Sequence, residues 1–116
     1  MVHSRSVVKH LPLTEATFYI LVALMEPQHG YAVMQDVEVM SDGTVKLGPG
    51  TLYGALTNLE RLKMIRKVGE ADRRKIYVIT DFGQAVLDRQ VERLGIMVRS
   101  AQGKRQYVAT TQQKGK

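Results

Sequence analysis

The sequence of 116 residues contains no cysteine. This absence excludes a disulfide framework, a zinc site with cysteine ligands and a thiol nucleophile. Long apolar runs are also absent: the longest covers residues 18–25, whereas a membrane span needs about 18 or more apolar residues. The first six residues lack the basic, apolar and small-residue order of a secretory signal. We therefore expect no membrane association and a cytoplasmic location.

Groups of residues that carry enzyme chemistry are missing as well. His3, His10 and His29 are far apart in the sequence, and the carboxylates are scattered without metal-ligand spacing. The residues Gly48, Pro49 and Gly50 form too short a segment for a nucleotide-binding phosphate loop. The sequence thus predicts no catalytic residues, no metal site, no cofactor and no enzyme.

Apolar spacing predicts three helices in the first half of the chain, at residues 15–25, at about 31–40 and at about 49–63. Thr14 is the expected N-cap of the first helix. The faces expected to be buried hold Phe18, Leu21, Val22 and Met25 in the first helix and Leu52, Leu56 and Leu59 in the third.

The second half is expected to hold a β-hairpin and one long helix. Residues 65–68 and 75–79 are β-branched segments of strand length, separated by a basic loop at 69–74. A helix follows at about 82–98. Residues 100–116, rich in Gln, Thr, Gly and Lys, are expected to form a basic flexible tail.

Three helices, a hairpin and a final helix follow one another in the order of a winged helix-turn-helix with an added C-terminal helix. We therefore predict a mainly α (α+β) fold. In such a module the third helix enters the major groove of double-stranded DNA, and the hairpin wing contacts the backbone or the minor groove.

The charge distribution supports nucleic acid as the partner. The chain has a net charge of +6, yet residues 1–60 carry six acidic and three basic side chains, whereas residues 61–75 carry seven basic and two acidic ones. A basic run is by itself more often a solvated surface. Here it coincides with the hairpin tip, so we expect Arg73, Arg74 and Lys75 to contact DNA.

The beginning of the third helix is the other expected DNA contact. Pro49 suits the first helical position, and Gly50 leaves the backbone N–H groups open to a phosphate. Thr51 and Tyr53 add hydroxyl donors in the first turns. For Tyr53 a half-buried core position is an equally good explanation. A protein–protein interaction module on the same fold is the alternative function.

The last predicted helix carries an apolar stripe at coiled-coil spacing, formed by Leu87, Val91, Leu94 and Val98. One helix at the end of a small domain cannot bury such a stripe by itself, so the stripe predicts a homodimer interface. The alternative is that the stripe packs back on its own domain.

Four segments of the sequence resemble the PadR-type transcriptional regulators: residues 47–65, residues 29–31 (His-Gly-Tyr), residues 74–77 and residues 79–83. The resemblance extends over residues 13–98. It implies a homodimeric DNA-binding repressor of a pseudo-palindromic operator, in which the final helix mediates dimerisation. It also places Pro49, Gly50, Thr51 and Tyr53 on the DNA-facing part of the recognition helix, and Arg73 and Arg74 in the wing.

The length resembles the short subgroup of that family, which includes multidrug-sensing repressors. It implies three parts without a separate sensory domain: a DNA-binding domain at 1–80, a dimerisation helix at 81–99 and the tail at 100–116. In that subgroup planar drugs stack on a tryptophan of the last helix. This sequence has no tryptophan and offers Gly95, Ile96 and Met97 instead. Aromatic stacking of a drug is therefore not expected. A small apolar or phenolic effector remains an expected partner, but the sequence does not identify the residues that would bind it.

Overall fold

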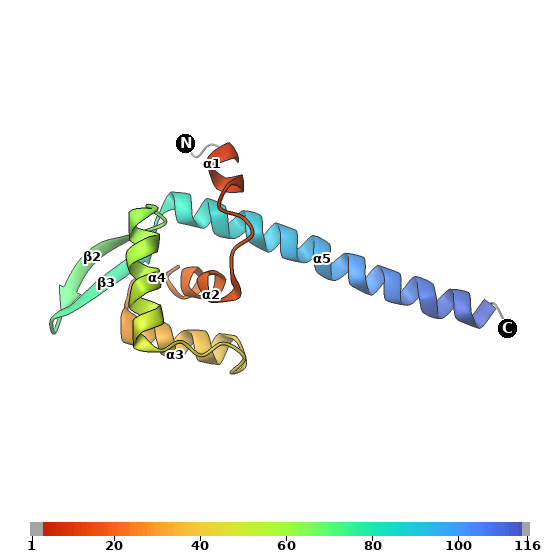
Figure 1. Ribbon diagram of the computed structural model, residues 1–116, viewed down its shortest axis with the longest axis horizontal. Helices are drawn as coiled ribbons and strands as arrows, with labels where there is room; N and C mark the ends of the chain where they lie inside the picture. Colours follow the sequence, from red (N-terminus) through yellow and green to blue (C-terminus); the bar gives the residue numbers. More distant parts are fainter. Residues whose placement is uncertain (1–3, 115–116) are drawn as a thin grey trace.

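The computed structural model describes residues 4–114, and within them it shows a helical domain, a small antiparallel sheet and one projecting helix (Figure 1). This architecture confirms the predicted winged-helix fold with a long C-terminal helix. The elements, in chain order, are α1 (Ser4–Val8), α2 (Glu15–Ala23), β1 (Gln28–His29), α3 (Gly30–Met40), α4 (Pro49–Arg61), β2 (Ile65–Ala71), β3 (Arg74–Ile79) and α5 (Asp81–Lys114).

Polar side chains begin three of the helices, as the sequence predicts for Thr14. The Thr14 hydroxyl oxygen accepts a hydrogen bond of 3.1 Å from the Thr17 N–H before α2. His29 Nδ1 accepts one of 3.3 Å from the Ala32 N–H at the start of α3. Thr80 Oγ1 accepts one of 3.0 Å from the Gly83 N–H before α5. These caps satisfy N–H groups that have no partner within their own helix.

The sheet has the strand order β1-β3-β2 and is antiparallel throughout. In the hairpin Ala71 pairs with Arg74, so only Asp72 and Arg73 lie in the turn. The predicted loop at 69–74 is therefore wrong. Both turn residues have positive φ, 52° and 64°, the arrangement that matches the twist of two antiparallel strands and permits a two-residue turn.

The core confirms the predicted inner face of α4 and corrects that of α2. Leu52, Leu56 and Leu59 are buried. In α2 the buried residues are Ile20, Leu21 and Ala23, whereas Phe18 and Val22 are half-buried and Met25 is exposed. Nearly every position of α2 is apolar, so its sequence pattern does not define one face, and the surrounding elements select the buried residues.

The length of α5 corrects the predicted tail. The helix continues for 34 residues to Lys114, and Figure 1 shows its second half extending away from the domain. Residues 100–114 thus belong to this helix. They contain no proline, and most of them are residue types that tolerate a helix. Residues 115–116 of the predicted tail lie outside the described part. No helix of the described part is long and apolar enough to cross a membrane.

Candidate nucleic-acid interface

The start of α4 is open to solvent, as expected for a helix that contacts DNA. Gly48 is its N-cap and makes no side-chain cap bond, and Pro49 occupies the first turn. Gly50, Thr51 and Tyr53 are exposed. Because the opposite face of the helix is buried in the core, this polar face is held outward.

The tip of the wing carries three exposed cations, Arg73, Arg74 and Lys75. Among the described side chains, those of residues 6–112, ion pairs join only Lys67 to Glu70 and Arg89 to Glu92, so none of the three cations has a carboxylate partner there. The Arg74 guanidinium carbon instead lies 6.0 Å from the centre of the Tyr31 ring, in a cation–π contact. The positive charge of the wing is therefore available to an anion.

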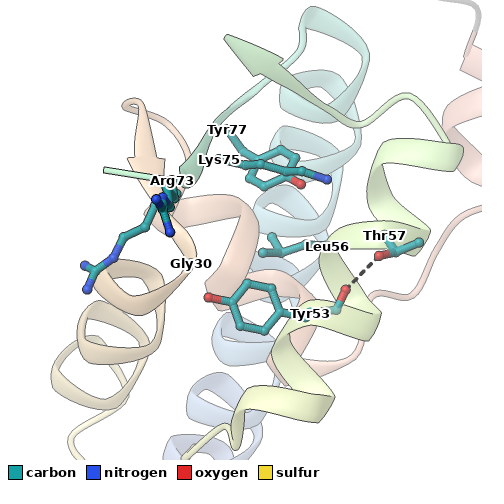
Figure 2. A pocket seen from close by; sticks show the side chains of 8 residues that line it. Gly30, Tyr53, Leu56, Thr57, Arg73, Lys75 and Tyr77 are labelled. Atoms are coloured by element: carbon teal, nitrogen blue, oxygen red, sulfur yellow. Dashed lines mark hydrogen bonds between the residues drawn. The ribbon is translucent and has the colours of Figure 1, made fainter. Parts of the chain in front are cut away.

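A groove of about 300 Å³ joins the wing to α4 (Figure 2). Tyr53, Leu56 and Thr57 of α4 line one side, and Lys75 and Tyr77 of β3 line another, with Arg73 and Arg74 at the tip and Gly30 at the start of α3. The structure thus brings Tyr53 together with all three predicted wing cations. Pro49, Gly50 and Thr51 do not line the groove and precede it on α4.

Tyr53 is packed on one side and open on the other. A Cβ atom built on Gly30 would lie 2.8 Å from Tyr53 Cε1 and 3.0 Å from its hydroxyl oxygen, so the ring rests on the start of α3. The residue nevertheless keeps 51% of its surface exposed. The ring is thus half-packed against the domain, while its exposed part leaves the predicted DNA contact sterically open.

Tyr77 is a lining residue that the sequence analysis did not identify as part of the site. It keeps only 8% of its surface exposed. Burial raises the pKa of its phenol, and the Glu60 carboxylate raises it further. The phenol is therefore neutral at physiological pH and can donate a hydrogen bond at the base of the groove. Residues 76–79 of β3 are all apolar, so the sequence does not indicate which of them is most buried, and only the folded chain shows that Tyr77 borders the groove.

The predicted dimer stripe on α5 divides into an inner and an outer part. Leu87 keeps 2% of its surface exposed and belongs to the chain's own core, so its assignment to a dimer interface is corrected. Leu94 is half-buried, and Val91 and Val98 are exposed. The domain accounts for the first residue of the stripe and leaves the other three uncovered or partly covered.

A second cavity, of about 170 Å³, lies between the start of α2 and α5. Its lining residues are mainly apolar: Leu13, Phe18, Tyr19 and Leu94, with Glu15 and Gln90. Gln90 is buried, and its Oε1 atom accepts a hydrogen bond of 2.9 Å from the Leu13 N–H. That bond fixes the wall between the two helices. Within residues 4–114 no group of three histidines and carboxylates is placed to hold a metal ion.

Comparison with known families matches residues 20–89 to the transcriptional regulator PadR-like family. A curated relative, described as an uncharacterized 37.1 kDa protein in transposon Tn4556 of Streptomyces fradiae, is 38% identical over 77 residues. The match covers 66% of this chain and 22% of that protein. The chain therefore spans about a fifth of the length of this relative.

Solved structures share the fold over most of the chain. A transcriptional regulator from Clostridium thermocellum is similar with a TM-score of 0.63 at 20% identity, over 89% of this chain and 97% of that one. A PadR family transcriptional regulator from Eggerthella lenta gives 0.58 at 26% identity, over 87% and 85%. Sso10a-2, a DNA-binding protein from Sulfolobus solfataricus, gives 0.65 at 18% identity, over 83% and 92%.

Proposed function

The chain belongs to the PadR-like family of transcriptional regulators, and from this premise we propose that it is a homodimeric repressor that binds a pseudo-palindromic operator. We further propose that a small apolar or phenolic ligand releases it from DNA. Members of the family are regulators and not enzymes, and the scattered histidines and carboxylates of this chain agree with that.

The groove between α4 and the wing is the observation that carries the proposal. A nucleic acid backbone needs unpaired cations beside polar groups, and Arg73, Arg74 and Lys75 supply the cations opposite Tyr53 and Thr57. Pro49, Gly50 and Thr51 then enter the major groove at the exposed start of α4, where backbone N–H groups favour a phosphate. Contacts from the wing provide affinity, and contacts from α4 provide sequence specificity.

Dimerisation is proposed through the outer part of the α5 stripe. Val91 and Val98 are exposed together with Ile96 and Met97, on a helix that extends beyond its own domain. Apolar side chains at this density on one helix are buried in most proteins by a partner surface. A second copy of the chain supplies that surface by symmetry.

The ligand is proposed to bind beside this interface. The cavity between α2 and α5 is mainly apolar and shares Leu94 with the stripe. At about 170 Å³ it is smaller than a typical pocket for a drug-sized ligand, which occupies roughly 300–1,000 Å³. A second subunit packed on α5 would enlarge and close it, so that a ligand there changes the distance between the two wings.

A mobility-shift titration on DNA from immediately upstream of the protein's own gene tests the function. We expect specific binding above random DNA of equal length, and affinity that falls steeply with salt. The double variant Arg73→Ala/Arg74→Ala should weaken binding and reduce the slope of log affinity against log salt by about 4, because a dimer loses two arginines from each of its two wings. Arg93→Ala, an exposed arginine on α5, is the matched control.

The same titration separates the alternative function. A winged-helix module for protein–protein interaction would show no salt-sensitive DNA binding, and replacing the wing arginines would change nothing in the titration. Repeating the titration with a panel of apolar and phenolic compounds tests release. An unchanged mobility shift with every compound would contradict the ligand-responsive part of the proposal and leave the DNA-binding part intact.

A further inference from the structure

We propose that Gly30 and Tyr31, the first two residues of α3, are positioning residues for the DNA-binding groove. Gly30 sets the direction of the Tyr53 ring, and Tyr31 holds the Arg74 guanidinium. The inference rests on the proposed function, because these positions affect binding only if the groove takes the DNA backbone.

Gly30 acts through the side chain that it lacks. Tyr53 Cε1, Cζ and the hydroxyl oxygen occupy the space where a Cβ atom at Gly30 would lie, at 2.8 to 3.0 Å. Figure 2 shows the Tyr53 ring directed from α4 toward Gly30. The three atoms are at the far end of a side chain with free rotation, so a methyl group at position 30 displaces the ring and leaves both helices in place.

Tyr31 does not line the groove and acts through Arg74, which does. Its exposed ring lies under the Arg74 guanidinium at 6.0 Å from centroid to carbon. An arginine has many rotamers, and a contact with an aromatic face selects a subset of them before DNA arrives. The entropy that binding would otherwise lose on ordering this arginine is thereby reduced.

The segment that carries both residues is itself fixed to the wing and to the helical domain. Gln28 and His29 form β1, which pairs with Tyr77 and Ile76 of β3. The Gln28 amide nitrogen donates hydrogen bonds of 2.6 Å to the Ala23 carbonyl oxygen and 2.8 Å to Asp36 Oδ2. Because β1 is bound to β3 by strand pairing and to the helical domain by the Gln28 side chain, the two residues that follow it keep a constant position relative to α4 and the wing.

Operator affinity of purified full-length variants tests the inference. Tyr31→Leu should raise the Kd about two- to fivefold by removing the cation–π contact, and Tyr31→Phe should restore the parent value, because the ring is retained. Gly30→Ala should raise the Kd at least about fivefold, with a thermal midpoint within about 3 °C of the parent.

Two control variants repeat the same chemistry away from the groove. Gly103→Ala places a methyl group on α5 where no atom lies within 4 Å. Tyr107→Leu removes an exposed ring that Lys104 Nζ approaches to 5.4 Å. Both should bind the operator like the parent. Sedimentation of every variant confirms that its assembly is unchanged.

A measurement without DNA isolates the geometry. The Tyr53 ring lies against Gly30, so ring currents should shift the Gly30 Hα resonances, and Tyr53→Leu should abolish that shift.

Failure of the parent to bind any operator overturns the proposed function and this inference with it. Parent binding together with equal affinities for Gly30→Ala and Tyr31→Leu overturns the positioning role alone.

Discussion

Arg73 has a backbone conformation that side chains of its kind rarely adopt, with a φ of 64° in the turn of the wing. The left-handed region costs roughly 1–2 kcal/mol for a residue with a Cβ atom, and hairpin turns of this type usually contain Asn-Gly or Asp-Gly. An arginine at the second turn position therefore lowers the stability of the hairpin while it places a cation at the outermost point of the groove.

Replacing this arginine should separate stability from binding. Arg73→Gly should raise the free energy of unfolding by about 1 kcal/mol, because glycine adopts positive φ freely. It should also weaken operator binding and lower the log–log salt slope by about 2, one contact from each subunit of the dimer. Urea denaturation and salt-dependent titrations measure the two effects.

Asp72→Gly is the matched control for that prediction. Asp72 also has a positive φ, of 52°, but its replacement keeps all three wing cations. Stability should rise by less than for Arg73→Gly, since aspartate tolerates the left-handed region better. DNA affinity should stay equal or increase. A salt slope that is unchanged in Arg73→Gly would remove this residue from the phosphate contacts.

Gly83, at the start of α5, lies against the short connection between α4 and β2. A Cβ atom there would overlap the Met64 carbonyl oxygen and lie 2.8 Å from Ile79 Cγ1. Nearby, Thr80 Oγ1 donates a hydrogen bond of 2.6 Å to the Lys63 carbonyl oxygen. The junction is thus a backbone-to-backbone contact that only glycine permits.

Gly83→Ala should accordingly lower the free energy of unfolding by about 3 kcal/mol or more, because the obstructing atom belongs to the backbone and cannot rotate away. Gly103→Ala on the same helix has open space and should raise stability by roughly 0.5–1 kcal/mol. Equal stabilities of the two variants in urea denaturation would contradict the close approach.

Tyr77 gives the protein a defined response at alkaline pH. Burial, followed by the Glu60 carboxylate, raises the pKa of this phenol above its ordinary value of 10.0. The neutral form is therefore favoured in the folded chain. Its stabilising contribution is complete below about pH 10, where the unfolded chain titrates, and is lost as the pH rises through the higher folded pKa.

Comparison with Tyr77→Phe isolates this contribution from the other groups that titrate at high pH. The free energy of unfolding of the parent should fall relative to that of the variant as the pH rises above about 10. At neutral pH the difference should be constant. A constant difference over the whole range in urea titrations would mean that the phenol titrates alike in both states.

At the scale of elements, α5 has two different environments along one helix. Val86 and Leu87 are buried in the core, and Gln90 is hydrogen-bonded to the chain before α2. Beyond this point the apolar residues Val91 and Val98 are exposed. The inner part therefore completes the domain, and the outer part is available to a partner.

A charge on the outer part should prevent the proposed dimer. Val98→Glu should sediment as a monomer at micromolar concentration, since a buried unpaired carboxylate is strongly unfavourable in an apolar interface. Val39→Glu is the control, because Val39 is 76% exposed on α3 and away from α5. A dimeric Val98→Glu would place the interface elsewhere.

At the scale of the whole molecule, the described part of the chain is elongated. Its extents are 67 × 34 × 20 Å and its radius of gyration is 17.9 Å, whereas a compact domain of 100 residues has about 13 Å. The excess comes from α5, which extends past the domain in Figure 1. Pairing of two such helices would set the distance between two wings and two α4 helices.

The distance between the two wings should determine the spacing of the two half-sites in the operator. Half-sites read by a symmetric dimer are expected about 34–36 Å apart, one turn of DNA, or a multiple of it. Inserting half a turn, about 5 base pairs, should weaken binding because the second half-site then faces away. Affinity for the spaced DNA equal to that for the parent operator in mobility-shift assays would indicate independent binding of each subunit.

Local signals in the sequence predicted much of the fold and of the site. The N-cap Thr14, the buried residues Leu52, Leu56 and Leu59, and the basic wing tip are all as expected, because each depends on neighbours within a few residues. The two-residue strand β1 was not predicted, since so short a segment has no periodicity of its own and exists only by pairing with β3.

The sequence by itself determined which residues form helices, where most of them begin and where the positive charge is concentrated, because capping, apolar spacing and charge are properties of the local chain. Only the tertiary structure decided which face of the apolar α2 is buried, that Leu87 belongs to the core, and that Tyr53 meets Gly30 and the wing. The physical reason is that these outcomes depend on packing between segments distant in sequence, where shape and available space select among patterns that are locally equivalent.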